Sequence, residues 1–398
     1  MTPTHTADPI VIVGAARTPM GSFQSDFASQ SAHDLGGVAI RVAVERAGVN
    51  PELVDEVLFG NCLMAGQGQA PARQAAIKGG LPLSAGAVTL SKMCGSGMKA
   101  TMLAHDMLLA GSATVMVAGG MESMTNAPYL LLKGRGGYRM GHDKIYDHMM
   151  LDGLEDAYEA GRSMGTFGED CAAKYSFTRE QQDAFAIASV TRAKAATENG
   201  AFATEIAPVT VKDRTGERVV SIDEGPGKVK LDKIPGLKPA FKKDGTITAA
   251  SSSSINDGAA ALVLMRESTA KAQGLKPLAR IVAHSTHAQE PNWFATAPVG
   301  ATQKLLAKTG WAVSDVDLWE INEAFAVVPM ALMKELDIPH AKVNVNGGAC
   351  ALGHPIGASG ARILVTLLHA MQARGAKKGV ATLCIGGGEA TAMAIELI

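Results

Sequence analysis

The chain has few cysteines, few aromatic residues and no long apolar run among its 398 residues. No stretch approaches the roughly 20 apolar residues that span a bilayer, so the sequence predicts no membrane helix. The five cysteines are odd in number and widely spaced, unlike the disulfide framework of a small secreted protein. They are Cys62, Cys94, Cys171, Cys350 and Cys384. We therefore expect a reducing, intracellular compartment.

An excess of charge of either sign is also missing. The 37 basic and 38 acidic residues leave a net charge near -1, so no general field attracts nucleic acid or an anionic membrane. Residues 1–10 contain no lysine or arginine and lead directly into an apolar run, which fits neither a signal nor a transit peptide. The sequence predicts a cytoplasmic protein whose partners bind at local sites.

Glycine, in contrast, is abundant, with 44 residues, and 47% of the chain is hydrophobic. Apolar, strand-like runs such as 10–13 and 114–118 alternate with helix-like stretches such as 34–47. This alternation predicts an α/β fold. The length predicts two or three domains, and the glycines predict places where the backbone turns tightly or approaches a ligand closely.

Two stretches look like copies of one unit. Residues 94–97 open an apolar helix over 98–110, and a buried strand over 115–118 follows and ends in glycines. Residues 354–360 similarly open a helix over 361–373, followed by a strand over 380–385 and more glycines. Each copy places a helix N-terminus beside a glycine-rich strand end, where open α/β sheets bind ligands.

Between the copies, residues 125–254 form an inserted, loop-rich domain. We expect residues 1–124 to be the first half, with about 255–276 returning to it, and 277–398 to be the second half. A capping box at Thr178 predicts a helix running toward Glu198. The serine tract 251–254 reads either as a flexible linker or, between a strand candidate at 246–250 and a turn at 256–258, as a hydroxyl-rich loop that lines a ligand.

Four residues could carry chemistry. Cys94 precedes a helix, whose N-terminus can favour a thiolate, and His354 could act as a base. Cys384 lies at a strand end before Gly386, whose N–H could bind an oxyanion, and Asn322 also follows a strand. Each also has a structural interpretation: buried thiols, a satisfied histidine and a turn or cap.

A zinc site is a further interpretation, because Cys350 stands four residues before His354. Structural zinc usually uses paired Cys-x-x-Cys knuckles, which the sequence lacks, and a closed site with three cysteines would leave no position open for catalysis. We therefore predict no metal.

Taken together, four segments resemble the signature segments of the thiolase family, in order. They are 94–97 (CGSG), 322–325 (NEAF), 353–357 (GHPIG) and 384–388 (CIGGG). The resemblance covers residues 10–398 and is closest to the acetyl-CoA acetyltransferase branch. It implies two duplicated αβαβα-type halves, an inserted loop domain that covers coenzyme A (CoA), and a dimer or a tetramer built as a dimer of dimers.

The resemblance also implies a mechanism. Cys94 would attack a thioester while His354 takes its proton, and Cys384 would be the second acid/base. One oxyanion site would use His354 and a water held by Asn322, and the other the N–H groups of Cys94 and Gly386. No cofactor is implied, because CoA, acetyl-CoA and acetoacetyl-CoA are substrates and products. The residues expected along the CoA path are Ser253, Leu154, Met164, Phe241, Ala249, Phe294 and Phe325.

Several positions depart from the family pattern. Ser163 stands where many biosynthetic members have histidine, which alters a contact to the pantetheine arm or the substrate. Phe294 replaces a methionine, and its rigid ring predicts short acyl chains. Pro226 replaces the tyrosine of the potassium-activated branch, so we predict no potassium dependence. Glu389 and Cys350 have no assigned role, although Cys350 could be redox-sensitive.

Three other functions are weighed against this one. A 3-ketoacyl-CoA thiolase of broader range, as in fatty-acid β-oxidation, would keep all four segments and differ in pocket width. A decarboxylating condensing enzyme would need a second histidine in place of Asn322 and would lack Cys384. A scaffold that keeps the fold without activity would have no need of two placed thiols and a base.

Overall fold

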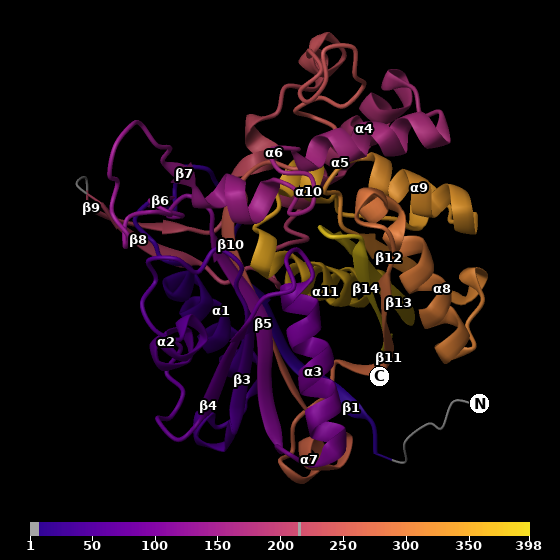
Figure 1. The fold of residues 1–398 in the computed structure, drawn as a ribbon. Helices are drawn as coiled ribbons and strands as arrows, with labels where there is room; N and C mark the ends of the chain where they lie inside the picture. Colours follow the sequence, from indigo (N-terminus) through magenta and orange to yellow (C-terminus); the bar gives the residue numbers. More distant parts are fainter. Residues whose placement is uncertain (1–7, 214–215) are drawn as a thin grey trace.

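The computed structural model describes residues 8–213 and 216–398 (Figure 1). The expectation that the N-terminus is neither a signal nor a transit peptide rests partly on residues 1–7, which lie outside the described residues. Ten strands form one mixed sheet, in the order β12-β13-β14-β11-β1-β10-β5-β3-β4, with β2 also paired to β10. Their bounds are β1 Ile10–Arg17, β2 Gly21–Ser22, β3 Glu56–Gly60, β4 Gly86–Leu90, β5 Val115–Ser123, β10 Asn256–Arg266, β11 Ala279–Ala288, β12 Leu318–Ile321, β13 Lys378–Ile385 and β14 Glu389–Leu397.

The sheet contains the predicted duplication. Outward from its centre, the first half runs β1, β10, β5, β3 and the second runs β11, β14, β13, β12. In both halves the first two pairings are antiparallel and the outermost is parallel. The short antiparallel contact of β1 with β11 joins the halves. The α/β fold with two similar halves is therefore confirmed.

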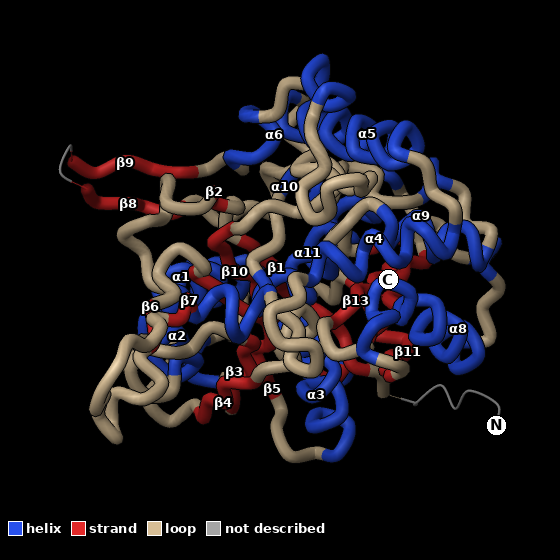
Figure 2. Tube along the Cα trace, turned by 45° about the horizontal axis from the view of Figure 1, so that its top comes forward, coloured by secondary structure: helices blue, strands red, loops and turns tan. Residues whose placement is uncertain are grey.

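Helices lie in three layers around the two half-sheets. Helices α1 (Ala32–Ala47) and α2 (Pro71–Lys78) cover the outer face of the first half, and α8 (Ala297–Thr309) covers that of the second. Helices α3 (Ser96–Ala110) and α11 (Ile356–Arg374) pack in one apolar cluster with strands of both halves. Figure 2 shows α1 and α2 on the side of the sheet away from α8. The N-terminal ends of α3 and α11 thus meet in the middle layer.

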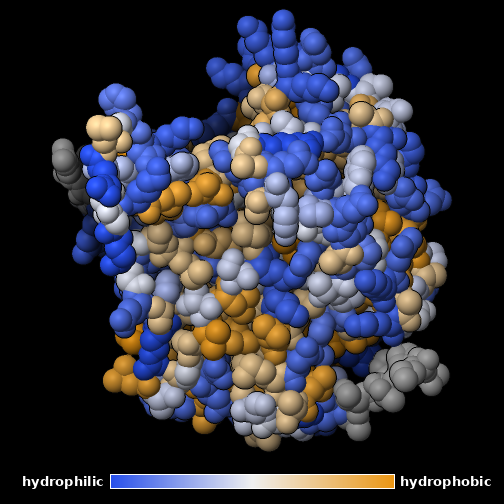
Figure 3. Space-filling view, viewed as in Figure 1, coloured by the Kyte–Doolittle hydropathy of each residue, from blue (hydrophilic) through white to orange (hydrophobic). Residues whose placement is uncertain are grey.

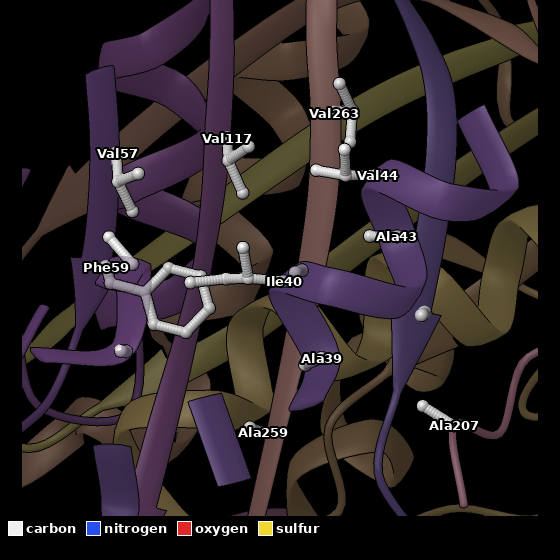
Figure 4. Close-up of a cluster of buried hydrophobic side chains, with 14 of the residues drawn as sticks. Ala39, Ile40, Ala43, Val44, Val57, Phe59, Val117, Ala207, Ala259 and Val263 are labelled. Atoms are coloured by element: carbon white, nitrogen blue, oxygen red, sulfur yellow. The ribbon is translucent and has the colours of Figure 1, made fainter. Parts of the chain in front are cut away.

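Local signals and burial agree in α1. Ser31 and Asp34 form a capping box at its start, and Gly48 ends it with φ of 68°, a left-handed conformation that glycine adopts without strain. Ile40 points from the helix toward Phe59 of the sheet within the cluster drawn in Figure 4. This helical face is wholly apolar, and its burial removes that apolar surface from water.

The segment between β5 and β10 is folded. It contains the pairs β6 (Tyr129–Leu130) with β7 (Tyr146–Asp147) and β8 (Val209–Asp213) with β9 (Gly216–Val220), a π-helical turn at Met150–Leu154, and three helices. These are α4 (Met164–Tyr175), α5 (Arg179–Glu198) and α6 (Glu224–Lys228). The capping box of Thr178 with Gln181 and the end of α5 before Asn199 are confirmed. The domain boundaries stay a prediction.

Two local predictions around the serine tract were wrong. Residues 246–250 form turns with one isolated bridge and are not a strand, because the side chains of Glu169 and Ser251 take up their backbone N–H groups. Residues 256–258 begin β10 and are not a turn, because they pair with both β2 and β5. The remaining helices are α7 (Glu267–Ala272), α9 (Val327–Leu336) and α10 (Ala349–Leu352). Among the described residues, no helix combines the length and apolar character needed to cross a membrane.

Candidate active site

Cys94 lies in a strained turn directly before α3. Met93, the preceding residue, has φ of 44°, in the left-handed region that a side chain rarely adopts. At Gly95 a Cβ would lie 2.3 Å from the side chain of Ile385, so glycine lets the end of β13 approach the turn. The backbone N–H of Gly386 lies close enough to the Cys94 thiol to favour its ionised form. The turn therefore brings the two duplicated units together at this thiol.

Cys384 is the second thiol at this point. It is buried near the end of β13 and shares an apolar cluster with Phe294 and Phe325. Gly387 and Gly388 follow with φ of 91° and 86°, which turns the chain into β14. Burial raises the pKa of Cys384 well above its usual value, and a negative charge on Cys94 would raise it further. Cys384 is therefore a neutral thiol at rest.

The expected ease of ionising Cys94 was wrong. Burial raises the pKa of Cys94 to about 11, and the N–H groups of Gly386 and of Cys94 itself only partly oppose this. Cys94 packs against the apolar cluster that contains Leu63, Met124 and Ile356, and this burial outweighs the N–H groups near the sulfur. At pH 7 only about one molecule in ten thousand holds the thiolate, so the site needs a base.

His354 is such a base by geometry. Its Nδ1 lies 2.5 Å from Ser359 Oγ. Because Ser359 Oγ donates its own hydrogen bond to Pro355 O at 2.9 Å, it accepts the bond from Nδ1–H of His354. The other nitrogen, Nε2, is buried without a hydrogen-bond partner among the described residues. Burial, with the positive charge of Arg362, lowers the pKa of His354 to about 3. The imidazole is thus neutral, with the lone pair of Nε2 free to accept a proton.

Asn322 supplies an amide with nothing bound to it. Its backbone N–H donates to Thr382 O at 3.0 Å at the end of β12, and its side chain is fully buried. Neither the side-chain oxygen nor the nitrogen has a partner in the described part of the chain. Buried amides are normally hydrogen-bonded, so this one can hold a water or a ligand atom.

Glu323, the next residue, anchors the loop that carries Asn322. Its buried carboxylate accepts bonds from Ser189 Oγ and Asn344 Nδ2, both at 2.7 Å, and from the N–H of Cys350 at 2.9 Å. Cys350 is therefore placed by this network, and burial raises the pKa of its thiol well above the usual value.

A cleft of about 410 Å³ opens beside these residues. Seven residues singled out from the sequence line it, namely Leu154, Met164, Phe241, Ala249, Ser253, Phe325 and His354. Phe294 does not line it; its ring packs edge-on against Phe167, with 6.0 Å between the ring centroids. Lining residues that sequence reasoning did not single out for this role include Ile255 and Ile356. The cleft is mostly apolar, with hydroxyl groups along one side.

The serine tract is an ordered wall of this cleft. Ser252 Oγ donates to Thr248 O at 2.8 Å, and Ser253 donates to Ala324 O through both its N–H and its Oγ. Ser251 Oγ accepts from the N–H of Thr248. These bonds favour the ligand-lining interpretation over a flexible linker.

Two supporting residues, Glu122 and Ser359, escaped sequence reasoning. The carboxylate of Glu122 accepts bonds from Asn61, Cys62, Leu63 and Gly357, and so ties the loop after β3 to the start of α11. Ser359 sets the tautomer of His354. Ser359 had the stronger signal in the sequence, because it lies in the first turn of α11, five residues after His354.

Glu389, which had no assigned role, forms an ion pair with Lys92. This pair joins the turn before Cys94 to the start of β14. The zinc interpretation gains no support, because Cys350 and His354 belong to no group of three close metal donors in residues 8–213 and 216–398.

Two similar α/β halves meet at an apolar cleft that His354 lines, and Cys94 and Cys384 lie in the apolar clusters that form its walls; this is the arrangement of an α/β protein with a nucleophile site. The family model for the thiolase N-terminal domain matches residues 10–268, and that for the thiolase C-terminal domain matches residues 275–397. The chain belongs to the thiolase family.

Characterised relatives cover nearly the whole chain. An acetyl-CoA acetyltransferase from Escherichia coli is 53% identical over 388 residues, or 97% of this chain and 98% of the relative. One from Cupriavidus necator is 50% identical over 389 residues, or 97% and 99%. The solved acetyl-CoA acetyltransferase of Bacillus anthracis has a TM-score of 0.95 at 43% identity and covers 98% and 99%. A thiolase from Ascaris suum in complex with coenzyme A has a TM-score of 0.92 at 42% identity and covers 98% and 100%.

Proposed function

We propose that the protein is an acetyl-CoA C-acetyltransferase, which condenses two acetyl-CoA to acetoacetyl-CoA and CoA, reversibly, through an acetyl group on Cys94. The observation that carries this proposal is the meeting of Cys94 with the N–H of Gly386, beside Cys384 and the free Nε2 of His354. The relatives' names support the substrate. CoA takes part as a substrate, and no cofactor is needed for this chemistry.

In the first half-reaction Cys94 takes the acetyl group. The Nε2 of His354 accepts the thiol proton as Sγ bonds to the thioester carbonyl carbon, and the carbonyl oxygen becomes an oxyanion. The carbon–sulfur bond to CoA then breaks, and the CoA sulfur takes the proton from His354. Because the thiol pKa is about 11 and the imidazole pKa about 3, this proton moves only as the new bond forms.

In the second half-reaction Cys384 acts as the base. Its thiol proton first passes to Nε2 of His354, and the resulting thiolate removes an α-proton from a second acetyl-CoA; the carbanion then bonds to the acetyl carbon on Cys94. The Cys94–carbon bond then breaks, and the leaving Cys94 sulfur takes the proton from His354. Carbon acids are weak, so a base of high pKa suits this step, and burial raises the pKa of Cys384 well above its usual value.

Two groups of donors stabilise the oxyanions. The N–H groups of Gly386 and Cys94, which favour a negative charge on the Cys94 sulfur, form one site. A water held by the unpartnered amide of Asn322, together with His354 once it is protonated, forms the other. Ser253, Met164, Leu154, Phe241, Ala249 and Phe325 line the cleft that receives the pantetheine arm.

Short acyl chains fit the apolar cluster behind Cys384. Phe294 and Phe167 fill this region with two buried rings, which leaves less room than a flexible methionine would. Phe294 therefore limits acyl length from behind the reacting thiols, and acetoacetyl-CoA is the preferred ketoacyl substrate. The potassium independence inferred from Pro226 belongs to the same proposal.

We further propose a cytoplasmic homo-oligomer, a dimer of dimers. β4 is an edge strand, and apolar side chains near it are exposed, including Val88 at 44% and Leu83 at 75%. Apolar patches also show on the face that carries β4 and α3 in Figure 3. Light scattering at micromolar concentration tests this assembly, and a monomer would refute it.

The test of function is thiolysis by free CoA of acetoacetyl-CoA, 3-ketohexanoyl-CoA and 3-ketooctanoyl-CoA. We expect turnover to be highest on the four-carbon substrate and to be lost in Cys94→Ser and Cys384→Ser. Ser112→Ala, an exposed position just past the end of α3, is the control and should keep its activity. Equal rates along the series would make the protein a broader 3-ketoacyl-CoA thiolase, and inactivity of the folded wild type would refute the enzymatic proposal.

A further inference from the structure

Three metal-ligating side chains meet on the far part of α3, away from the cleft. His105 and Asp106 are neighbours in that helix, and His284 comes from β11. Asp106 Oδ1 lies 3.0 Å from His105 Nδ1 and 2.9 Å from His284 Nε2. One donor atom from each residue lies within 4.8 Å of the other two.

The two imidazoles are held in place, whereas the carboxylate is free to move. The side chains of His105 and His284 are only 12% and 15% exposed, and their rings stand at 90° with centroids 5.1 Å apart. Asp106 is 52% exposed. The cluster thus has a buried, fixed half and an open half that faces solvent.

We propose that His105, Asp106 and His284 form a binding site for a divalent transition-metal ion such as Zn²⁺. Two imidazole nitrogens and one carboxylate oxygen are ligands that zinc prefers, at about 2.0–2.1 Å each. Ligands around such an ion lie roughly 3.3 Å apart. Asp106 Oδ1 lies 3.0 and 2.9 Å from the two imidazole nitrogens, and all three donor atoms lie within 4.8 Å of one another, so small shifts of the side chains admit the ion. Water takes the fourth position on the exposed side. Calcium and magnesium are disfavoured, because they prefer oxygen ligands.

Lys308 is the nearby positive charge that opposes an ion. Its Nζ donates to the backbone carbonyl of His284 at 2.9 Å, so the ammonium is held at the strand backbone. It weakens binding without occupying a ligand position. Lys308→Met is therefore expected to tighten zinc binding several-fold.

The site joins elements 178 residues apart in sequence, the middle-layer helix and a strand of the second half. Cys94 precedes His105 by eleven residues, which is about 16 Å along a helix. A bound ion would therefore act on the stability of the α3–β11 contact, and its effect does not depend on the acyl-transfer chemistry. Because His284 lies far from the other two ligands in the sequence, no local motif marks the site, and the sequence predicted no metal.

Binding is tested on the full chain after chelator treatment, by calorimetric titration with Zn²⁺ and by the absorption spectrum with Co²⁺. We expect about one ion per chain, a rise in Tm on binding, and cobalt bands of nitrogen and oxygen ligation without a thiolate charge-transfer band. His284→Gln and Asp106→Asn should each weaken binding at least tenfold, whereas the exposed His142→Gln should not.

Each result is decisive. Unchanged affinity in both His284→Gln and Asp106→Asn would overturn the proposal, as would a thiolate band that disappears in Cys94→Ser. Variant folding is checked by thermal unfolding with chelator present, where both variants should melt within a few degrees of wild type. Should His284→Gln not fold, the result for Asp106→Asn, whose side chain is half exposed, decides alone.

Discussion

Ser359→Ala removes the hydroxyl that selects the tautomer of His354. In the wild type, Ser359 Oγ accepts a hydrogen bond from Nδ1–H of the imidazole at 2.5 Å and donates its own hydrogen bond to Pro355 O. Nε2 is thereby left as the acceptor that faces the cleft. Without the hydroxyl, either Nδ1–H is buried without a partner or the proton moves to Nε2, where it blocks the base.

The cost follows from burial. A buried donor that loses its partner costs about 1–3 kcal/mol, and the active tautomer bears this cost in the variant. Because about 1.4 kcal/mol is a factor of ten in rate, kcat/KM for acetoacetyl-CoA thiolysis should fall by about fivefold to about 150-fold. KM should change little, since Ser359 does not line the cleft.

The assay compares wild type, Ser359→Ala and Ser359→Thr, each with its free energy of unfolding from urea titration. Threonine keeps the hydroxyl and should recover part of the lost kcat, whereas a purely structural role would give losses that follow stability in both variants. A Ser359→Ala enzyme within twofold of wild-type kcat/KM would refute the tautomer argument.

Three further predictions concern pH and burial. Iodoacetamide should alkylate Cys94 about ten times faster for each pH unit from pH 8 to 10, because the pKa of this thiol is about 11. The rate is measured by peptide mass spectrometry, and a rate that is already constant above about pH 7 would contradict this prediction. Glu122→Gln places a side-chain NH₂ group against two of the four groups that donate hydrogen bonds to the Glu122 carboxylate. The free energy of unfolding, measured in urea, should therefore fall by about 2–5 kcal/mol. A loss of less than about 0.5 kcal/mol would count against the anchoring role of Glu122. Burial lowers the pKa of His354 to about 3, so below about pH 6.5 the unfolded chain binds a proton that the folded chain does not, and the folded state loses stability. Between pH 7.5 and 4.5 the free energy of unfolding of wild type should fall by about 2–3 kcal/mol more than that of His354→Asn. Parallel curves of unfolding free energy against pH would refute this prediction.

Local signals in the sequence predicted local structure well. The capping box at Thr178 and the glycine that ends the helix at 111 act within a few residues, so the pattern alone specifies them. Cys94, Asn322, His354 and Cys384 each stand near the end of a strand or the start of a helix, which is why the sequence singles them out, and their catalytic roles stay a prediction. Residues 246–250 were misread because side chains from elsewhere in the chain, above all Glu169, take up their hydrogen bonds, and residues 256–258 because they pair with strands distant in sequence.

What sequence patterns did not predict depends on contacts between distant segments. Glu122 reaches Gly357 across 235 residues, and His284 meets Asp106 across 178. The sign of the Cys94 pKa shift was misjudged for the same reason. Proximity to a helix N-terminus is visible in a sequence, whereas the desolvation that outweighs it comes from Leu63, Met124 and Ile356.

Glycine connects the duplication to the site. A Cβ at Gly97 would lie 2.7 Å from the backbone nitrogen of Ala361, and one at Gly360 would lie 2.4 Å from that of Met98. A Cβ at Gly120 would lie 2.1 Å from the carbonyl oxygen of Gly357. Helices α3 and α11 can therefore bring their N-terminal ends together only because both lack side chains at these contacts. That close approach places the turn of Cys94 and the loop of His354 at one cleft, so the abundance of glycine in the sequence is a requirement of the two-helix site.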